Sequence, residues 1–179
     1  KRNGAGIYHF PNGNKYEGEF KDGNIQGHGI LYAFDGGKYE GQWKNGMFHG
    51  RGVYIFPDNT KYDGDFVRGN KNGFGIEISS DGTKYDGQWK DGLFHGKGVE
   101  TRPDGTLYSG EWRKNLAHGH GKLTLPDGSS YEGDYQNGEF HGNGIMILNG
   151  ISRYEGQFKS GKKHGYGVEI LNDGTKKKG

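Results

Sequence analysis

Apolar and polar positions alternate along this chain in short runs that are separated by glycine-rich turns. One run, residues 39–43, reads Tyr-Glu-Gly-Gln-Trp, so tyrosine, glycine and tryptophan occupy every second position. Because the side chains of a strand point alternately to its two faces, these three residues share one face of a short β-strand. A second run follows each Gly-x-Gly pair and carries isoleucine or valine, as at Val53. The pattern predicts two short strands in each segment.

The two-strand segment recurs with a period of 23 residues. Its tyrosine opens a Tyr-x-Gly triplet at Tyr16, Tyr39, Tyr62, Tyr85, Tyr108, Tyr131 and Tyr154. A strict period in this range is typical of arrays whose units pack only on their neighbours. Pairs such as Asn12-Gly13 and Asp81-Gly82 indicate tight turns, and short connections make neighbouring strands antiparallel. The sequence therefore predicts an all-β chain, an elongated antiparallel meander of about 15–16 short strands.

We expect a single repeat array over residues 1–179. A partial repeat occupies residues 1–15, full repeats start at residues 16, 39, 62, 85, 108, 131 and 154, and a trailing fragment occupies residues 177–179. In the sixth unit Asn149-Gly150 lies one residue early, which predicts a local bulge before Tyr154. Lys177 stands where the next tyrosine is expected, and the chain begins in mid-unit without methionine, which suggests a fragment of a longer protein.

Glycine inside a strand needs an explanation, because it normally weakens a strand. Here a glycine recurs two positions after every repeated tyrosine. We expect each of these glycines to leave a slot in which an aromatic ring from a neighbouring strand lies across the backbone. The seven tyrosines then form a structural ladder that supplies much of the buried area of a single-layer sheet.

Composition indicates an ordered chain with a thin core. Hydrophobic residues make up only 29% of the chain and glycine numbers 38, yet there are 12 Tyr, 10 Phe and 3 Trp, which argues against disorder. The net charge of +2 does not favour a nucleic-acid partner. No apolar stretch reaches the length of a membrane span, and the absence of cysteine excludes disulfides and thiolate metal sites.

Histidine recurs immediately before the Gly-x-Gly pair, at His49, His95, His118, His141 and His164. Other copies carry Asn3, Gln26 or Asn72 there, so the position needs a hydrogen-bonding group that ties down the loop. Acidic residues after the tyrosines and lysines before them are expected on a solvated face, where they pair across strands. We therefore predict a protein that is not an enzyme and has no catalytic, cofactor-binding or metal-binding residues.

Taken together, Tyr-Glu-Gly-x-Trp, a central glycine, His-Gly-x-Gly-Val and a closing Asp-Gly resemble the MORN (membrane occupation and recognition nexus) repeat. Seven full copies in phase cover the chain. The resemblance implies a twisted single-layer antiparallel sheet with one hairpin per repeat and a curved groove. It also implies a cytoplasmic, cytoskeleton-associated scaffold in membrane-cytoskeleton or ciliary and flagellar organisation. Its groove would accept a partner protein as a helix or an extended peptide.

The partner-binding hypothesis concerns the aromatic side chains. Phenylalanine precedes His-Gly only in alternate copies, so the array has a two-unit super-period. This row reflects either duplication and loop packing, or apolar anchors that are available to an extended partner. The candidate partner-binding residues are Phe48, Phe94, Phe140, Trp43, Trp89, Trp112 and Tyr135.

Two other functions remain open at this point. A lysine cluster near the end of the chain is either a solvated polar end or a weak peripheral contact with anionic phospholipid, phosphoinositides included. Its members are Lys162, Lys163, Lys176, Lys177 and Lys178. Alternatively, the open strand edges of the sheet allow end-to-end homodimerisation in a cytoskeletal assembly.

Overall fold

The computed structural model describes all residues from Lys1 to Gly179 and consists of β-strands joined by turns. It contains no helix with the length and apolarity needed to cross a membrane. The strands are β1 (Gly4–His9), β2 (Lys15–Lys21), β3 (Asn24–Tyr32), β4 (Lys38–Lys44), β5 (Met47–Ile55), β6 (Lys61–Val67), β7 (Asn70–Ile78), β8 (Lys84–Lys90), β9 (Leu93–Thr101), β10 (Leu107–Arg113), β11 (Leu116–Thr124), β12 (Ser130–Gln136), β13 (Glu139–Leu148), β14 (Ser152–Lys159), β15 (Lys162–Leu171) and β16 (Lys176–Lys178).

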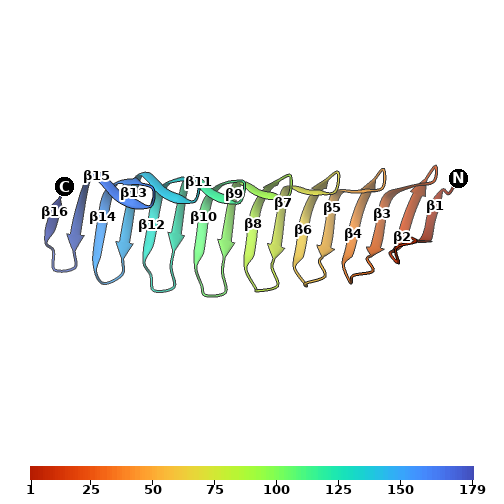
Figure 1. The fold of residues 1–179 in the computed structure, drawn as a ribbon, viewed down its shortest axis with the longest axis horizontal. Coiled ribbons are helices and arrows are strands. Elements are labelled where there is room, and N and C mark those ends of the chain that lie inside the picture. Colours follow the sequence, from red (N-terminus) through yellow and green to blue (C-terminus); the bar gives the residue numbers. More distant parts are fainter. The chain divides into compact units, whose positions relative to one another are not determined.

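All sixteen strands belong to one antiparallel sheet, and their order in the sheet is their order in the sequence. The predicted all-β antiparallel meander is therefore confirmed. The chain forms two compact units, Lys1–Leu93 and Phe94–Gly179. Within each unit, successive strands lie side by side and are joined by short hairpin turns (Figure 1).

Strand register in the N-terminal unit puts the repeated aromatic residues on one face of the sheet. Tyr39 of β4 pairs with Tyr54 of β5, and Trp43 pairs with Phe48. Gly41 lies between Tyr39 and Trp43 on the same face and pairs with a glycine of β5. We call this the aromatic face, and the opposite, more polar face the outer face.

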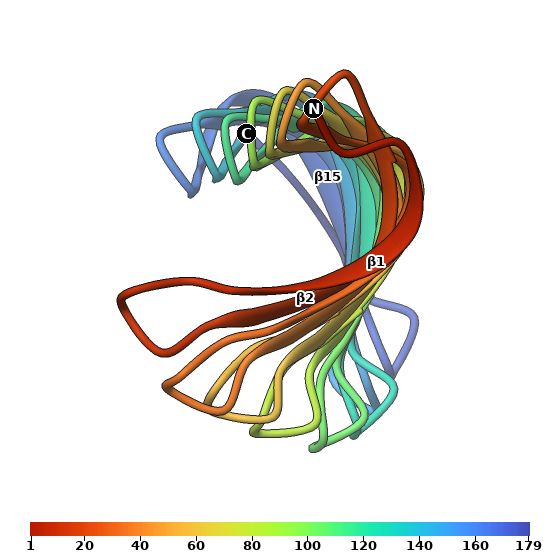
Figure 2. The same cartoon turned by 90° about the vertical axis from the view of Figure 1, so that its right-hand side faces the viewer.

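A bulge next to a glycine pair interrupts six hairpins: β2–β3, β4–β5, β6–β7, β10–β11, β12–β13 and β14–β15. In the second repeat, which starts at Tyr39, Gly41 pairs with Gly52 and the next pair is Trp43 with Phe48. Two residues along β4 therefore match four residues along β5. Gly50, inside this bulge, has a φ of 60°, a left-handed conformation that glycine adopts without strain. Bulges increase the local twist and bend of a strand. The strands of the unit are accordingly curved along their length (Figure 2).

The polar residue that follows the strand glycine holds the bulge in place. The Asp65 carboxylate accepts a hydrogen bond of 3.1 Å from the N–H of Phe74. The Glu19 carboxylate accepts one of 3.2 Å from the N–H of His28 in the first unit. These side chains satisfy backbone donors that the interrupted ladder would otherwise leave unpaired.

The seven repeated tyrosines form the core of the sheet. Each is at most 7% exposed, and each hydroxyl donates a hydrogen bond of 2.8 to 3.2 Å to the backbone carbonyl three residues later. A Cβ added to Gly52 would lie 2.5 Å from the Tyr39 hydroxyl oxygen, and one added to Gly41 would lie 2.7 Å from the same atom. The ring therefore lies across a pair of facing glycines. The ring over Gly41 comes from the same strand, not from a neighbouring strand as expected, and it reaches the neighbouring strand at Gly52.

Neighbouring repeats are linked through these rings. The Tyr39 ring meets Trp43 of its own repeat and Phe66 of the next repeat edge to face, with 5.2 Å between ring centroids in both pairs. Such pairs stabilise a fold by about 0.5–1.5 kcal/mol beyond the area that they bury. The ladder thus compensates within one layer for the missing second layer.

Backbone hydrogen bonds also link each of these hairpin turns to the repeat before it. The N–H of Gly46 donates to the carbonyl of Ile25 at 3.0 Å in the N-terminal unit, and the N–H of Gly138 donates to the carbonyl of Ala117 at 2.8 Å in the C-terminal unit. Gly46 and Gly138 have φ values of 74° and 86°, a left-handed conformation that glycine adopts without strain.

The C-terminal unit is built in the same way, with one turn of a different kind. The register between β13 and β14 runs without a shift, so the bulge expected before Tyr154 is wrong. The displaced glycine, Gly150, has a φ of 69° and lies inside a turn closed by a 2.9 Å hydrogen bond from the N–H of Ile151 to the carbonyl of Leu148. The turn absorbs the change, and the strands keep their pairing.

Candidate functional site

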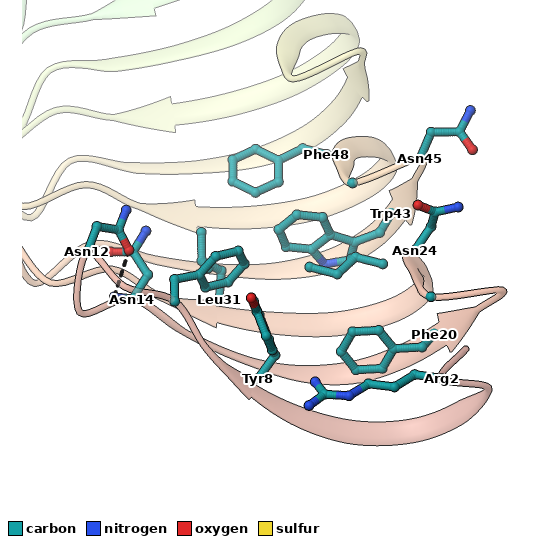
Figure 3. A pocket seen from close by; sticks show the side chains of 14 residues that line it. Arg2, Tyr8, Asn12, Asn14, Phe20, Asn24, Leu31, Trp43, Asn45 and Phe48 are labelled. Carbon is teal, nitrogen blue, oxygen red and sulfur yellow. Dashed lines mark hydrogen bonds between the residues drawn. The ribbon is translucent and has the colours of Figure 1, made fainter.

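The N-terminal unit has a hollow of about 650 Å³ on its aromatic face, which we call the N-terminal hollow. Its base is formed by rings and aliphatic side chains, and its rim by asparagines that lie at two ends of the strands (Figure 3). The lining residues are Arg2, Tyr8, Phe10, Asn12, Asn14, Phe20, Gly23, Asn24, Ile25, Leu31, Trp43, Asn45, Gly46 and Phe48.

The pairing of β2 with β3 and one hydrogen bond from β4 place the base of the hollow. Ile25 of β3 pairs with Phe20 of β2, and Leu31 pairs with the buried Tyr16. The indole N–H of Trp43 donates to the carbonyl of Gly29 at 3.1 Å, which fixes the plane of that ring. Phe20 and Trp43 are buried at 7% and 6% exposure, whereas Ile25 and Leu31 are half-buried and accessible. The side chains that a ligand can touch therefore rest on a rigid aromatic floor.

Asparagines at the rim are held by turns. The side chain of Asn12 accepts the N–H of Asn14 at 3.1 Å, and the side chain of Asn14 accepts the N–H of Phe34 at 2.9 Å. At the other end of the strands, Asn45 has a φ of 53° and its N–H donates to the side chain of Gln26 at 3.0 Å. These contacts leave amide groups of the rim to donate and accept hydrogen bonds.

Arg2 is the only charged side chain that lines the N-terminal hollow. Its guanidinium lies over the rings of Tyr8 and Phe20, 5.0 and 5.7 Å from their centroids. Cation–π contacts of this kind orient a cation without neutralising it. The hollow therefore combines an apolar base with one fixed positive charge.

Each 23-residue repeat has one position whose side chain varies and lies above the tyrosine of that repeat. We call it the stacking position. Phe48 stacks on Tyr39 with centroids 3.7 Å apart and an angle of 11° between the rings, and Phe140 stacks on Tyr131 at 3.8 Å and 16°. The stacking position of the seven units is held by Ile25, Phe48, Lys71, Phe94, Ala117, Phe140 and Lys163.

Lys71 shows how the stacking position accommodates a cation. Its ammonium lies 5.1 Å from the ring centroid of Tyr62 and 4.8 Å from that of Phe56, and it forms a close ion pair with Glu77. Burial lowers the pKa of the Lys71 amine to about 8, against which the carboxylate and the rings favour its charged form. Lys163 repeats the arrangement in the seventh unit, where it pairs with Glu169 at 2.7 Å.

Comparison with protein families gives one family over the whole array. The MORN repeat model matches residues 1–15, 16–38, 39–61, 62–84, 85–107, 108–130, 131–149 and 154–176. The chain belongs to the MORN repeat family. No curated protein matches the chain.

Solved structures with a similar fold come from the TCP10 domain of Danio rerio CPAP. The wild-type domain matches this MORN chain with a TM-score of 0.52 and 17% identity, over 96% of this chain and 81% of that one. The same domain in complex with a peptide of Danio rerio STIL matches with a TM-score of 0.57 and 16% identity, over 97% of this chain and 77% of that one. At this identity the likeness concerns the fold.

The predicted partner-binding residues of the MORN units fall into two groups. Four are buried in the ladder at 4 to 7% exposure: Trp43, Trp89, Trp112 and Tyr135. The other three, Phe48, Phe94 and Phe140, hold stacking positions and are half-buried. Of all seven, the N-terminal hollow includes Trp43 and Phe48. Partner binding by these residues stays a prediction.

The sequence did not identify several residues of the hollow. Arg2, Tyr8, Phe10 and the rim asparagines lie outside the strand aromatics on which the sequence hypothesis was based. One difference between repeats in the sequence points to the hollow. The first repeat has Ile25 and Leu31 where the second repeat has the larger Phe48 and Tyr54. Smaller side chains at these two positions of β3 leave room above the floor.

Three of the five predicted lipid-binding lysines line one hollow, and the other two lie outside it. Lys163, Lys177 and Lys178 line a hollow of about 440 Å³ that also contains Glu169, and Lys163 is paired with that carboxylate. Lys162 and Lys176 are exposed and lie outside this hollow. Lipid binding and homodimerisation both stay predictions.

The histidines of the MORN units form no group of three or more potential metal ligands with cysteines or acids. The hydrogen-bonding role expected at their position is observed for Asn3, whose side chain accepts the N–H of Asp22 at 2.8 Å, and for Gln26. His118 differs, because its Nδ1 is buried without a hydrogen-bond partner.

Proposed function

We propose that this MORN array is a protein-interaction module whose N-terminal hollow binds an extended peptide segment of a partner. The observation that carries the proposal is the composition of this hollow of about 650 Å³, which has an apolar base and amide groups at two ends of the strands. Apolar side chains of a peptide would occupy the base, as in other peptide-binding grooves.

An extended peptide fits the rim better than a helix does. The backbone of a helix satisfies its own N–H and C=O groups, whereas an extended backbone leaves them for the receptor. Asn12, Asn14, Asn24 and Asn45 place side-chain amides along the rim, and each amide can donate as well as accept. The structure of the CPAP domain with a STIL peptide supports a peptide as the class of partner for this fold.

The family further supports a scaffold rather than an enzyme as the role of the chain. We extend the proposal to a cytoskeletal setting, which the family resemblance implies together with a cytoplasmic location. A ciliary or flagellar site of action and a membrane contact belong to the same proposal and depend on the partner.

The test uses a change that the fold already tolerates elsewhere. Units three and seven carry lysine and glutamate where the first unit has Ile25 and Leu31, so the variant Ile25→Lys, Leu31→Glu transfers an existing ion pair into the hollow. Peptides selected on the native chain from a random display library are measured by fluorescence anisotropy. We expect at least about a tenfold loss of affinity, because charged side chains replace the apolar base (about 1.4 kcal/mol per tenfold).

The matched control is Ile76→Lys on the outer face, since Lys122 holds the equivalent position in the fifth unit. This variant should bind the selected peptides as the native chain does. Equal binding by the Ile25→Lys, Leu31→Glu variant, or failure to select any peptide, would contradict the proposed function.

A further inference from the structure

Within the C-terminal unit, one stacking position is occupied only by a methyl group. Ala117 stands where Phe140 stacks on Tyr131 in the following unit. The tyrosine below Ala117 is Tyr108, whose only ring contacts are edge-to-face ones with Trp112 at 4.8 Å and Tyr135 at 5.1 Å. The flat side of the Tyr108 ring therefore has no stacked partner from this chain.

Tyr108 is more exposed than the tyrosines that lie under a phenylalanine. Tyr108 is 6% exposed, whereas Tyr39 and Tyr131, which lie under Phe48 and Phe140, are 0% and 1% exposed. Ala117 itself is half-buried and pairs with Trp112, so it lies on the aromatic face.

The other units show how an aromatic ring fits into this position. The Phe48 ring lies flat on Tyr39 and meets the edges of Trp43 at 4.8 Å and Phe66 at 5.8 Å. Around Ala117 the residues equivalent to Trp43 and Phe66 are Trp112 and Tyr135, both aromatic. A ring at this position would therefore meet one stacked and two edge-on partners, which is a favourable arrangement for aromatic side chains.

Charge around Ala117 favours an aromatic ring over a cation. Where the stacking position holds Lys71 or Lys163, the same strand supplies a carboxylate, Glu77 or Glu169, as the ion-pair partner. The equivalent residue after Ala117 is Leu123, which pairs with Tyr108 across the strands. A lysine placed here would lack a carboxylate on its own strand, and the carboxylate that pairs with Tyr108 from β9, Glu100, is already held by Arg102. Leu123 instead offers an apolar wall.

We infer that a partner protein inserts an aromatic side chain, phenylalanine or a similar ring, at Ala117 and stacks it on Tyr108. The inference rests on the proposed function in one respect, since the inserted ring belongs to a bound segment of a partner. It adds a second contact, in the C-terminal unit, and specifies the chemistry of one partner residue.

Alanine methyl NMR offers a direct test, because the chain has only three alanines, Ala5, Ala33 and Ala117. The chain with ¹³C-labelled alanine methyls is titrated separately with N-acetyl-phenylalaninamide, N-acetyl-leucinamide and N-acetyl-lysinamide. We expect a saturable change in the chemical shift of the Ala117 methyl with the phenylalanine probe, since the methyl would lie beside the inserted ring. The phenylalanine probe should bind at least about threefold more tightly than the leucine probe, and the lysine probe most weakly. Ala5 and Ala33 should not respond.

The variant Ala117→Phe provides the second measurement. Its own ring should fill the stacking position, raise the midpoint of thermal unfolding and abolish the effect of the phenylalanine probe on Tyr108 and its neighbours. The control Ala5→Phe changes the outer face and should leave the Ala117 response unchanged.

Three results would overturn the inference: no saturable Ala117 shift, equal affinity for the leucine and phenylalanine probes, or undiminished probe binding by Ala117→Phe. If any of them occurs while the N-terminal hollow still binds selected peptides, the inference fails and the proposed function stands. A normal Ala117 response with no selectable peptide would instead contradict the proposed function of the hollow.

Discussion

At the scale of single residues, the fold depends on where a side chain is absent. The second glycine of each Gly-x-Gly motif lies against the tyrosine ring of its own hairpin, as Gly52 does against Tyr39. Gly6 occupies the same repeat position in the leading partial unit and pairs with Gly18, but no repeated tyrosine precedes it in the chain. The nearest atoms to a Cβ built on Gly6 belong to the Phe20 ring, at 3.4 and 3.6 Å.

Alanine substitution at these two glycines should therefore have very different effects. In Gly52→Ala the new Cβ would lie 2.5 to 2.7 Å from Tyr39 atoms, so the ring or the backbone must move. We expect a loss of roughly 2–4 kcal/mol in the free energy of unfolding, measured by urea denaturation. Gly6→Ala should change stability by less than about 1 kcal/mol. Similar losses in both variants would show that the glycines are needed for a reason other than the ring.

At the scale of the hairpin, the same framework carries two kinds of packing above the tyrosine. The second unit has Phe48 with Tyr54 on its second strand, whereas the third unit has Lys71 with Glu77. The side chains of Lys71 and Glu77 are only 17% and 14% exposed. Removing two charges from water costs free energy that their mutual attraction seldom exceeds by much.

Transferring the second unit's pair into the third unit should stabilise the chain. For the double variant Lys71→Phe, Glu77→Tyr we expect a gain of about 1–3 kcal/mol in the free energy of unfolding, because ring stacking replaces a desolvated ion pair. Lys71→Phe alone should be destabilising, since it leaves the Glu77 carboxylate half-enclosed without its cation. Urea denaturation of both variants measures these differences, and a double variant less stable than the native chain would contradict the argument.

How far the sequence predicts this architecture differs between hairpin and hollow. The 23-residue period, the turn glycines and the Tyr-x-Gly triplet predict the strands, their antiparallel order and a ring over the strand glycine, because each depends on local chemistry. They do not predict that this ring belongs to the strand's own tyrosine. The residues themselves do not predict the extra residues at Gly50 or the resulting bend, since nothing in a Gly-x-Gly pattern distinguishes a bulge from a regular pair. Only the family resemblance implies a curved groove. The N-terminal hollow depends on that bend and on the sizes of Ile25 and Leu31, so only the structure reveals it.

At the scale of the whole molecule, buried tyrosine hydroxyls make stability depend on alkaline pH. Burial raises the pKa of Tyr16, Tyr39 and Tyr131 from 10.0 to about 12, and it also raises the pKa of Tyr62 and Tyr108. A group whose pKa is higher in the folded chain keeps its full contribution below the unfolded value and loses it as the pH rises. The loss therefore begins near pH 10 and continues to about pH 12 for the first three tyrosines.

We expect the chain to unfold cooperatively within this alkaline window. Circular dichroism of the strands and the ultraviolet absorbance of tyrosinate should change together between about pH 10 and 12, because ionised tyrosines are tolerated only in the unfolded chain. Tyrosines that ionise while the strand signal stays constant would contradict the burial of these hydroxyls.

Lys71 makes stability depend on pH in the opposite direction, and it therefore provides an internal control. Its pKa is about 8 in the folded chain against 10.5 in the unfolded chain, so between these values the unfolded chain binds more protons and stability rises with pH. In the Lys71→Phe, Glu77→Tyr variant this rise should vanish, while the tyrosine-dependent loss above pH 10 remains.

The stacking position also bears on how a protein of this kind evolves. Its side chain lies above the tyrosine ladder, so isoleucine, phenylalanine, lysine and alanine all occur there without a change in strand register. A single substitution can therefore alter one contact of the aromatic face while the strands around it keep their places. New partner preferences can be acquired one repeat at a time, and the selection that maintains the fold acts on different residues from the selection that changes the ligand.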